Sequence, residues 1–157
     1  MSAIPLRRRD DAVSRWVCFR LGAQLYGLPI LQVQELLGNA AIEPVPGTTN
    51  QVCGVINLRG NVVTVLDLRV CLGLSPGPDS AESRIVVVEH GTESVGLRVD
   101  GVAEVRKVID GAIRPSPNVG SASSGGTVRG VYLRDGEMLT LLDPDAVVNG
   151  AQCLSER

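Results

Sequence analysis

The chain nearly repeats itself, and this internal duplication limits the folds available to it more than any other feature. Residues 17–36 (VCFRLGAQLYGLPILQVQEL) align with residues 86–105 (VVVEHGTESVGLRVDGVAEV) at an offset of 69. Further along, residues 54–69 (GVINLRGNVVTVLDLR) align with residues 130–145 (GVYLRDGEMLTLLDPD) at an offset of 76. Because both matches keep their glycines and come in the same order, we expect two homologous units of roughly 70 residues each.

Units of this size bury little apolar surface alone, so the two copies are expected to pack together and leave a cleft between them. Residues 73–83 (GLSPGPDSAES) are rich in Gly, Pro and Ser, as expected of a linker. We therefore expect a first subdomain at residues 15–80 and a second at residues 81–150. A flexible N-terminal tail at residues 1–14 and a C-terminal tail at residues 151–157 complete this division.

Local signals within each unit favour strands. The chain has one Trp, two Tyr and one Phe, so its core must come from Val, Leu and Ile, and β-branched residues pack well on a pleated surface. Asp135-Gly136 is a strong hairpin signal, because both residues tolerate positive φ. Residues 29–37 fit either a helix or a strand, and their equivalent around Gly101 favours a strand with at most one helical turn. Short strands joined by Gly-containing turns predict small all-β barrels.

Charge and aromatic content disfavour nucleic-acid binding. The formal net charge is −2, with 17 acidic residues and a single lysine, Lys107. No large positive field exists to neutralise phosphates, and four aromatic residues offer little for base stacking. A small nucleic-acid binder of the SH3 or OB type is therefore the weakest of the alternatives.

Candidate catalytic and metal-binding groups are few. The four cysteines do not lie at metal-ligand spacing and the chain has one histidine, so we expect no metal and no cofactor. His90 lies beside Gly91 in a turn and is expected to be solvated, whereas Cys53 and Cys71 are expected to be buried thiols. No membrane span and no export signal are visible, which predicts a cytoplasmic protein without direct membrane insertion.

Asp67 and Asp143 occupy equivalent positions and could form a carboxylate pair. Each also precedes a short segment with helical signals, including Pro144 at a first helical position and Gly73 or Gly150 at a helix end. We favour capping over catalysis for both. Without a plausible acid, base or nucleophile set, the sequence predicts that the protein is not an enzyme.

Two charges remain as candidates for recognition. Arg59 lies at a predicted hairpin tip, and its guanidinium suits carboxylate binding. Glu35 is flanked at period two by Val33 and Leu37, and a charge among exposed apolar residues is typical of a partner-binding groove. The alternative is that Arg59 and Glu35 are solvated or pair with each other.

Five segments in the same order resemble the CheW family of chemotaxis coupling proteins: YGLPILQVQEL (26–36), GVINLRG (54–60), VLDLR (65–69), VGLRVDGV (95–102) and IRPSP (113–117). The resemblance runs from about Trp16 to Val148. It implies an all-β fold of two tandem SH3-like five-stranded β-barrel subdomains that share an apolar interface. It also implies a non-enzymatic adaptor that couples the cytoplasmic tip of a methyl-accepting chemotaxis protein to the regulatory domain of the histidine kinase CheA.

The resemblance further implies which residues bind the partners. The receptor helix is expected in the groove between the barrels, at Val33, Glu35, Arg59, Val102 and Val105. Kinase contact is expected at Ile42 in the first barrel, and at Asn118 and Val119 in the second. Many relatives carry an acidic residue and an aromatic at this last place, and this chain carries neither. A CheW-like module of a paralogous system, such as gliding or pilus motility, with different partners is the alternative.

Overall fold

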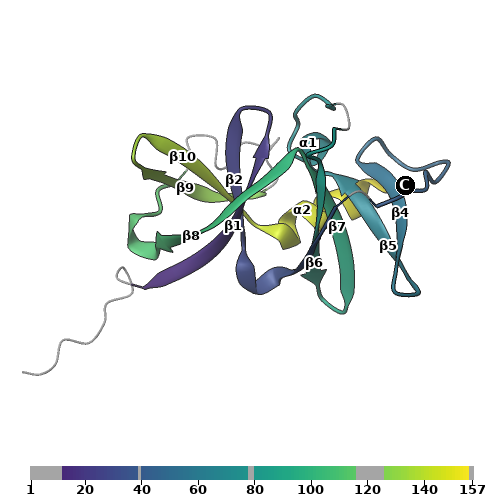
Figure 1. The fold of residues 1–157 in the computed structure, drawn as a ribbon, viewed down its shortest axis with the longest axis horizontal. Helices are drawn as coiled ribbons and strands as arrows, with labels where there is room; N and C mark the ends of the chain where they lie inside the picture. Colours follow the sequence, from purple (N-terminus) through teal and green to yellow (C-terminus); the bar gives the residue numbers. More distant parts are fainter. Residues whose placement is uncertain (1–11, 39, 78–79, 116–125, 156–157) are drawn as a thin grey trace, which may run out of the picture.

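The computed structural model describes residues 12–38, 40–77, 80–115 and 126–155, which form two curved five-stranded sheets and a few short helices (Figure 1). Sheet I contains, in spatial order, β8 (Gly101–Ile109), β1 (Val13–Leu21), β2 (Gln24–Pro29), β10 (Glu137–Leu142) and β9 (Val128–Arg134). Sheet II contains β3 (Val33–Leu37), β6 (Arg84–His90), β7 (Glu93–Val99), β5 (Asn61–Asp67) and β4 (Val52–Leu58). The helical elements are η2 (Ile30–Gln32), α1 (Leu68–Cys71), η3 (Asp110–Ala112) and α2 (Pro144–Ser155). The all-β expectation is confirmed.

Each sheet combines strands of both repeats. The β1–β2 hairpin of the first repeat pairs with β8 and β10 of the second, and the β6–β7 hairpin of the second repeat pairs with β3 and β5 of the first. When equivalent strands are exchanged, the two strand orders are identical. The register repeats as well, since Leu141 lies opposite Gly27 and its equivalent Val65 lies opposite Gly96. The backbone thus carries the duplication seen in the sequence.

This exchange corrects the expected subdomains at residues 15–80 and 81–150. The boundary near residue 80 separates two repeats, but it does not separate two sheets, because each repeat gives its first hairpin to the other sheet. The chain crosses from sheet I to sheet II through η2, and from sheet II to sheet I at Asp100, the single residue between β7 and β8. Connections this short leave no room for either hairpin to fold back onto its own repeat.

Buried apolar residues form three clusters that follow this symmetry. One lies within sheet I and includes Trp16 and Leu141, and another lies within sheet II and includes Ile85 and Val65. The largest, which we call the interface core, draws residues from both sheets and both α-helices. Its members are Phe19, Leu21, Leu28, Leu66, Leu68, Val86, Val88, Val95, Leu97, Val99, Leu142, Val147, Val148 and Ala151. The sheets are therefore joined by an apolar interface, as expected.

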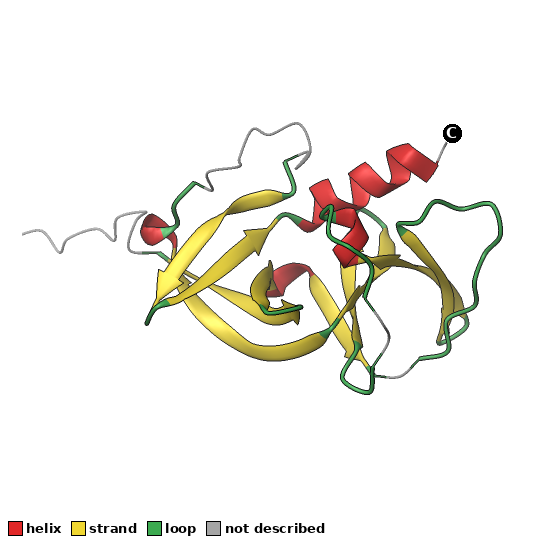
Figure 2. Ribbon diagram, turned by 90° about the horizontal axis from the view of Figure 1, so that it is seen from above, coloured by secondary structure: helices red, strands yellow, loops and turns green. Residues whose placement is uncertain are grey.

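The C-terminal helix α2 runs from the junction of the two sheets along sheet II (Figure 2). Val147, Val148 and Ala151 bury its apolar face in the interface core. The expected tail at residues 151–157 is therefore wrong at its beginning, because the helix continues to Ser155 and Ala151 is 2% exposed.

Gly54 and Gly130 allow a second segment to approach β4 and β9. Single bridges join Glu43 to Val55 and Arg114 to Val131 beside these two equivalent glycines. A Cβ at Gly54 would overlap the carbonyl oxygen of Glu43, and one at Gly130 would lie 2.8 Å from the carbonyl oxygen of Arg114. Glycine is required at both places because a backbone strand occupies the space of a side chain.

Candidate functional site

Glu35 and Arg59 form a two-pronged ion pair between β3 and the turn that joins β4 to β5. The Nη2 atom of Arg59 bonds Oε2 of Glu35, and Nη1 lies 3.4 Å from Oε1. The hydrogen bond from Arg59 lowers the pKa of the Glu35 carboxyl below its ordinary value. The Arg59 side chain is 72% exposed and the Glu35 side chain 27%, so the pair is open to solvent and to partners. The alternative that these charges pair with each other is what the structure shows.

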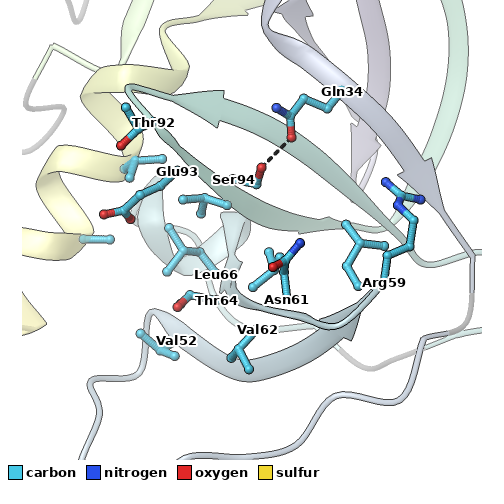
Figure 3. A pocket seen from close by; sticks show the side chains of 15 residues that line it. Gln34, Val52, Arg59, Asn61, Val62, Thr64, Leu66, Thr92, Glu93 and Ser94 are labelled. Atoms are coloured by element: carbon cyan, nitrogen blue, oxygen red, sulfur yellow. Dashed lines mark hydrogen bonds between the residues drawn. The ribbon is translucent and has the colours of Figure 1, made fainter.

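A hollow of about 620 Å³ lies beside Arg59, on the side of sheet II that faces α2 (Figure 3). Its walls are partly polar, and the Ser94 hydroxyl donates a 2.6 Å hydrogen bond to Oε1 of Gln34 across one of them. Leu66 and Val148, both members of the interface core, contribute to its apolar lining. Of the five expected receptor-binding residues, Arg59 alone lines this hollow.

Val33 and Val102 are equivalent residues, and each lies at the start of an outer strand, as the first residue of β3 and the second residue of β8, just after the chain has crossed between the sheets. Val33 lies opposite Val88 on β6, and Val102 lies opposite Phe19 on β1. Both side chains are half-buried against the interface core. The structure therefore brings these two valines to one apolar cluster, from opposite sheets.

The remaining expected contacts are more scattered. Val105, further along β8, is 50% exposed. Ile42 is half-buried against the sheet II cluster and lines a smaller hollow of about 380 Å³. Asn118 and Val119 lie outside the described residues.

Two ion pairs, which the sequence analysis missed, join the parallel segments 67–69 and 98–100 side by side. Arg98 bonds Asp67 at 2.9 Å where β5 and β7 run parallel. Arg69 holds Asp100 through its Nε, at 3.0 and 3.1 Å from the two carboxylate oxygens, and through Nη2. The sequence does contain a signal for these pairs, because residues 67–69 (DLR) and residues 98–100 (RVD) carry opposite charges at matching positions.

Asp100 is the residue at which the chain passes from sheet II to sheet I. Its Oδ2 also accepts a 2.6 Å hydrogen bond from the backbone N–H of Gly22, in the β1–β2 turn of sheet I. The bond from Arg69, with a smaller contribution from Gly22, lowers the pKa of this carboxyl. Asp100 therefore joins the crossover to α1 and to the β1–β2 turn of sheet I, two residues before Val102.

The two equivalent aspartates are helix caps. Asp67 accepts from the backbone N–H of Arg69 at 3.1 Å, and Asp143 accepts from those of Asp145 and Ala146 at 3.1 and 3.4 Å. The capping interpretation is confirmed, since each carboxylate satisfies N–H groups that the first helical turn leaves unpaired.

His90 is not the solvated residue that was expected. Its side chain is 19% exposed, and Nδ1 lies 2.9 Å from Oδ1 of Asp145 in the first turn of α2. The expectation failed because α2, which is distant in the sequence, packs beside His90 and shields it from solvent.

The thiols of Cys18 and Cys71 are poor nucleophiles. Burial raises the pKa of Cys18 to about 11 and that of Cys71 to about 12, so almost no thiolate exists at neutral pH. In the described part of the chain, no group of His, Cys, Asp and Glu side chains could hold a metal ion. Within the same residues, no helix is long and apolar enough to cross a membrane.

Comparison with known proteins gives a consistent result. The family model described as "CheW-like domain" matches residues 15–152. The chemotaxis protein CheW of Rhizobium meliloti is 34% identical over 131 residues, covering 83% of this chain and 84% of the relative. Protein PilI of Pseudomonas aeruginosa is 34% identical over 102 residues, covering 64% of this chain and 57% of the relative. The crystal structure of the scaffolding protein TtCheW from Thermoanaerobacter tengcongensis superposes with a TM-score of 0.77 at 33% identity, covering 84% and 90% of the two chains.

Proposed function

Because this chain belongs to the family of CheW-like domains, we propose that it is a non-enzymatic adaptor of a bacterial chemosensory array. In this role it couples methyl-accepting chemoreceptors to a CheA-type histidine kinase. It acts in the cytoplasm and is recruited to the receptors through protein contacts. Such contacts can each be modest and still assemble strongly when several act together.

The observation that carries the receptor half of this proposal is the placement of Val33 and Val102. Each leaves a half-buried apolar side chain on the interface core from the outer strand of its sheet. An amphipathic helix laid along the seam would cover both valines with its apolar face, which is a common mode of helix recognition. Val105 extends the apolar row on β8.

We propose that the ion pair of Glu35 and Arg59 adds a polar contact to the receptor site. Its exposed arginine and its carboxylate offer one donor group and one acceptor group, although Glu35 lies opposite Val87 and Val33 opposite Val88, so the pair is not part of the apolar row itself. Charged groups at the edge of an interface act mainly on specificity and association rate. We propose that this ion pair determines how the receptor helix is oriented in its site.

Kinase contact is proposed at Ile42 and, in the second repeat, at Asn118 and Val119. Ile42 packs against the sheet II cluster next to the bridge of Glu43 with Val55, so its segment is held firmly. Rigid presentation of an apolar residue lowers the entropic cost of docking.

The test is calorimetric titration of the full chain with a CheA regulatory domain and, separately, with the cytoplasmic hairpin of a methyl-accepting receptor. Val102→Glu should abolish hairpin binding and leave kinase binding intact. Leu133→Glu, at an exposed residue of β9, is the matched control. Absence of any binding of the wild-type chain at tens of micromolar would contradict the proposal.

The similarity to Protein PilI supports a second candidate, an adaptor of a paralogous system for pilus or gliding motility with a different partner set. Expression in a strain that lacks its own coupling protein separates the two candidates. Restored control of the kinase favours the first, and a well-folded chain that restores nothing favours the second.

A further inference from the structure

The outer face of β1 and β8 carries an exposed row of apolar and basic side chains. These two strands lie side by side at the edge of sheet I (Figure 1). Their register places Val13 opposite Ile109, and Arg15 opposite Lys107. Val13, Val105 and Ile109 are each about half exposed, at 46%, 50% and 47%. We call these five residues the outer stripe.

Arg15 and Lys107 form a like-charge pair at the centre of the outer stripe. Both side chains are exposed, and neither forms an ion pair with any residue that the structure describes. By contrast, the neighbouring Arg106 on β8 pairs with Glu104 and Glu137. Like charges directly opposite each other on a sheet destabilise it. The fold therefore keeps an unneutralised positive pair between apolar residues.

The outer stripe begins where the interface core between the two sheets ends. Val17, two residues after Arg15, is 4% exposed and lies opposite Val105. Three residues before Val105, Val102 packs on the interface core. A ligand that lies on Val102 and leaves the seam along β8 therefore reaches Val105 and then the two cations.

We propose, resting on the function proposed above, that the receptor helix continues along the outer stripe and that Arg15 and Lys107 bind one of its acidic side chains. Val105 and Lys107 are two residues apart on a strand, or about 6.8 Å. Four residues of a helix rise about 6 Å. The acidic residue therefore lies one helical turn from the apolar residue that contacts Val105, and an apolar residue about one turn further on contacts Val13 and Ile109, which lie opposite each other beyond the two cations.

Charge distinguishes this occupant from an anionic lipid surface. The chain carries 17 acidic residues against 15 basic ones, so the molecule as a whole is not attracted to a broad anionic surface. A single carboxylate on a narrow helix meets only the two cations and the apolar residues beside them. The outer stripe is two strands wide, which suits a helix better than a plane.

The test is titration of the full chain with the receptor hairpin used above, at about 50 mM and about 500 mM NaCl. Lys107→Glu and Arg15→Glu should each weaken hairpin binding about three- to tenfold at low salt, and the difference should shrink at high salt. Arg134→Glu, an equal charge reversal at an exposed arginine of β9, should bind like the wild type. The melting temperature of Lys107→Glu should stay the same or rise, because the reversal replaces a like-charge pair with an attractive one.

The possible results distinguish a receptor contact at the outer stripe from a lipid contact and from failure of the proposed function. Reversal of one acidic receptor residue to lysine should restore binding to Lys107→Glu. If the wild type binds the hairpin and Lys107→Glu binds as tightly as Arg134→Glu, the outer stripe is not a receptor contact and the proposed function stands. If the wild type does not bind the hairpin, both proposals fall. If vesicles of phosphatidylglycerol and phosphatidylcholine bind the wild type but not Lys107→Glu, while hairpin affinity is unchanged, the stripe contacts lipid and the inference is wrong.

Discussion

Arg59 and Asp135 occupy the same place in the two repeats, each as the first residue of a two-residue hairpin turn, with φ of 52° and 53°. The glycines that follow them, Gly60 and Gly136, also have positive φ. Two successive residues in this conformation form the turn whose twist suits a hairpin. The backbone of the two turns is therefore the same, while their charges are opposite.

This difference in charge makes the two barrel ends unlike. In the first repeat Arg59 pairs with Glu35. In the second, the equivalent residues Asp135 and Glu104 are both acidic, and Glu104 contacts Arg106 instead. A partner can therefore tell one end of the pseudo-symmetric molecule from the other.

Arg59→Glu should impair receptor binding while the protein stays folded, because the guanidinium is mostly exposed and holds no core residue. The double variant Glu35→Arg with Arg59→Glu restores the ion pair with the charges exchanged. It should melt like the wild type and still bind the receptor hairpin weakly, since in the proposed complex the receptor would meet the two charges in exchanged positions. Calorimetry and thermal melting check both parts. Unfolding of the single variant would show that the pair is structural.

Asp100→Asn should destabilise the protein at neutral pH by about 1–2 kcal/mol, because it weakens charged hydrogen bonds at a partly exposed site. The lowered pKa of Asp100 means that the native state binds a proton less readily than the unfolded chain. Its contribution is therefore complete above the unfolded value of about 4 and disappears as the pH falls through the lower native pKa. Urea unfolding between pH 7 and pH 2 should show the variant approaching the wild type at acid pH.

The control for this titration is Asp135→Asn, because Asp135 is 91% exposed and lies 3.7 Å from Arg134. It should change stability little at any pH. An equal loss in both variants would mean that the crossover is not held by Asp100.

Gly54→Ala should destabilise the protein by about 3 kcal/mol or more, since its φ is 149° and a Cβ would overlap the Glu43 carbonyl. Gly150→Ala should do the opposite. It lies in α2 with open space around it, and alanine in a helix interior is favoured over glycine by about 0.5–1 kcal/mol. Chemical denaturation of the two variants measures both effects. A mild effect at Gly54 would show that the segment of Glu43 can move away.

Val65→Ala should cost about 1–3 kcal/mol, because this side chain is fully buried in the sheet II cluster and its truncation leaves a cavity. Val62→Ala on the same strand is the matched control. Val62 is 74% exposed, so its truncation should change stability by less than about 0.5 kcal/mol. Equal losses at the two positions would contradict the burial pattern of β5.

The local parts of the fold could be predicted because they depend on neighbouring residues. The hairpin at Asp135-Gly136, the caps at Asp67 and Asp143, and the single helical turn before Val33 all follow from short-range signals. The pairing of hairpins could not be predicted in this way. The two repeats present the same alternation, so each hairpin suits either sheet, and the choice depends on where the chain crosses at η2 and Asp100.

The same difference between short-range and long-range features applies to the candidate site. The duplication predicts that Val33 and Val102 are equivalent, and the structure places both on the interface core. The sequence did not determine which residue pairs with Glu35, because β3 and the β4–β5 turn are distant along the chain. The contact of His90 with Asp145 was missed for the same reason, at a separation of 55 residues.

The exchange of hairpins has a consequence for the origin of the molecule. One repeat alone supplies a hairpin to one sheet and three strands to the other, so it completes neither sheet without a second copy. The present chain has the architecture of a domain-swapped homodimer whose two subunits have been fused end to end. Because the two copies differ in sequence, equivalent surfaces such as the turns at Arg59 and Asp135 are not identical, and each can serve a different partner.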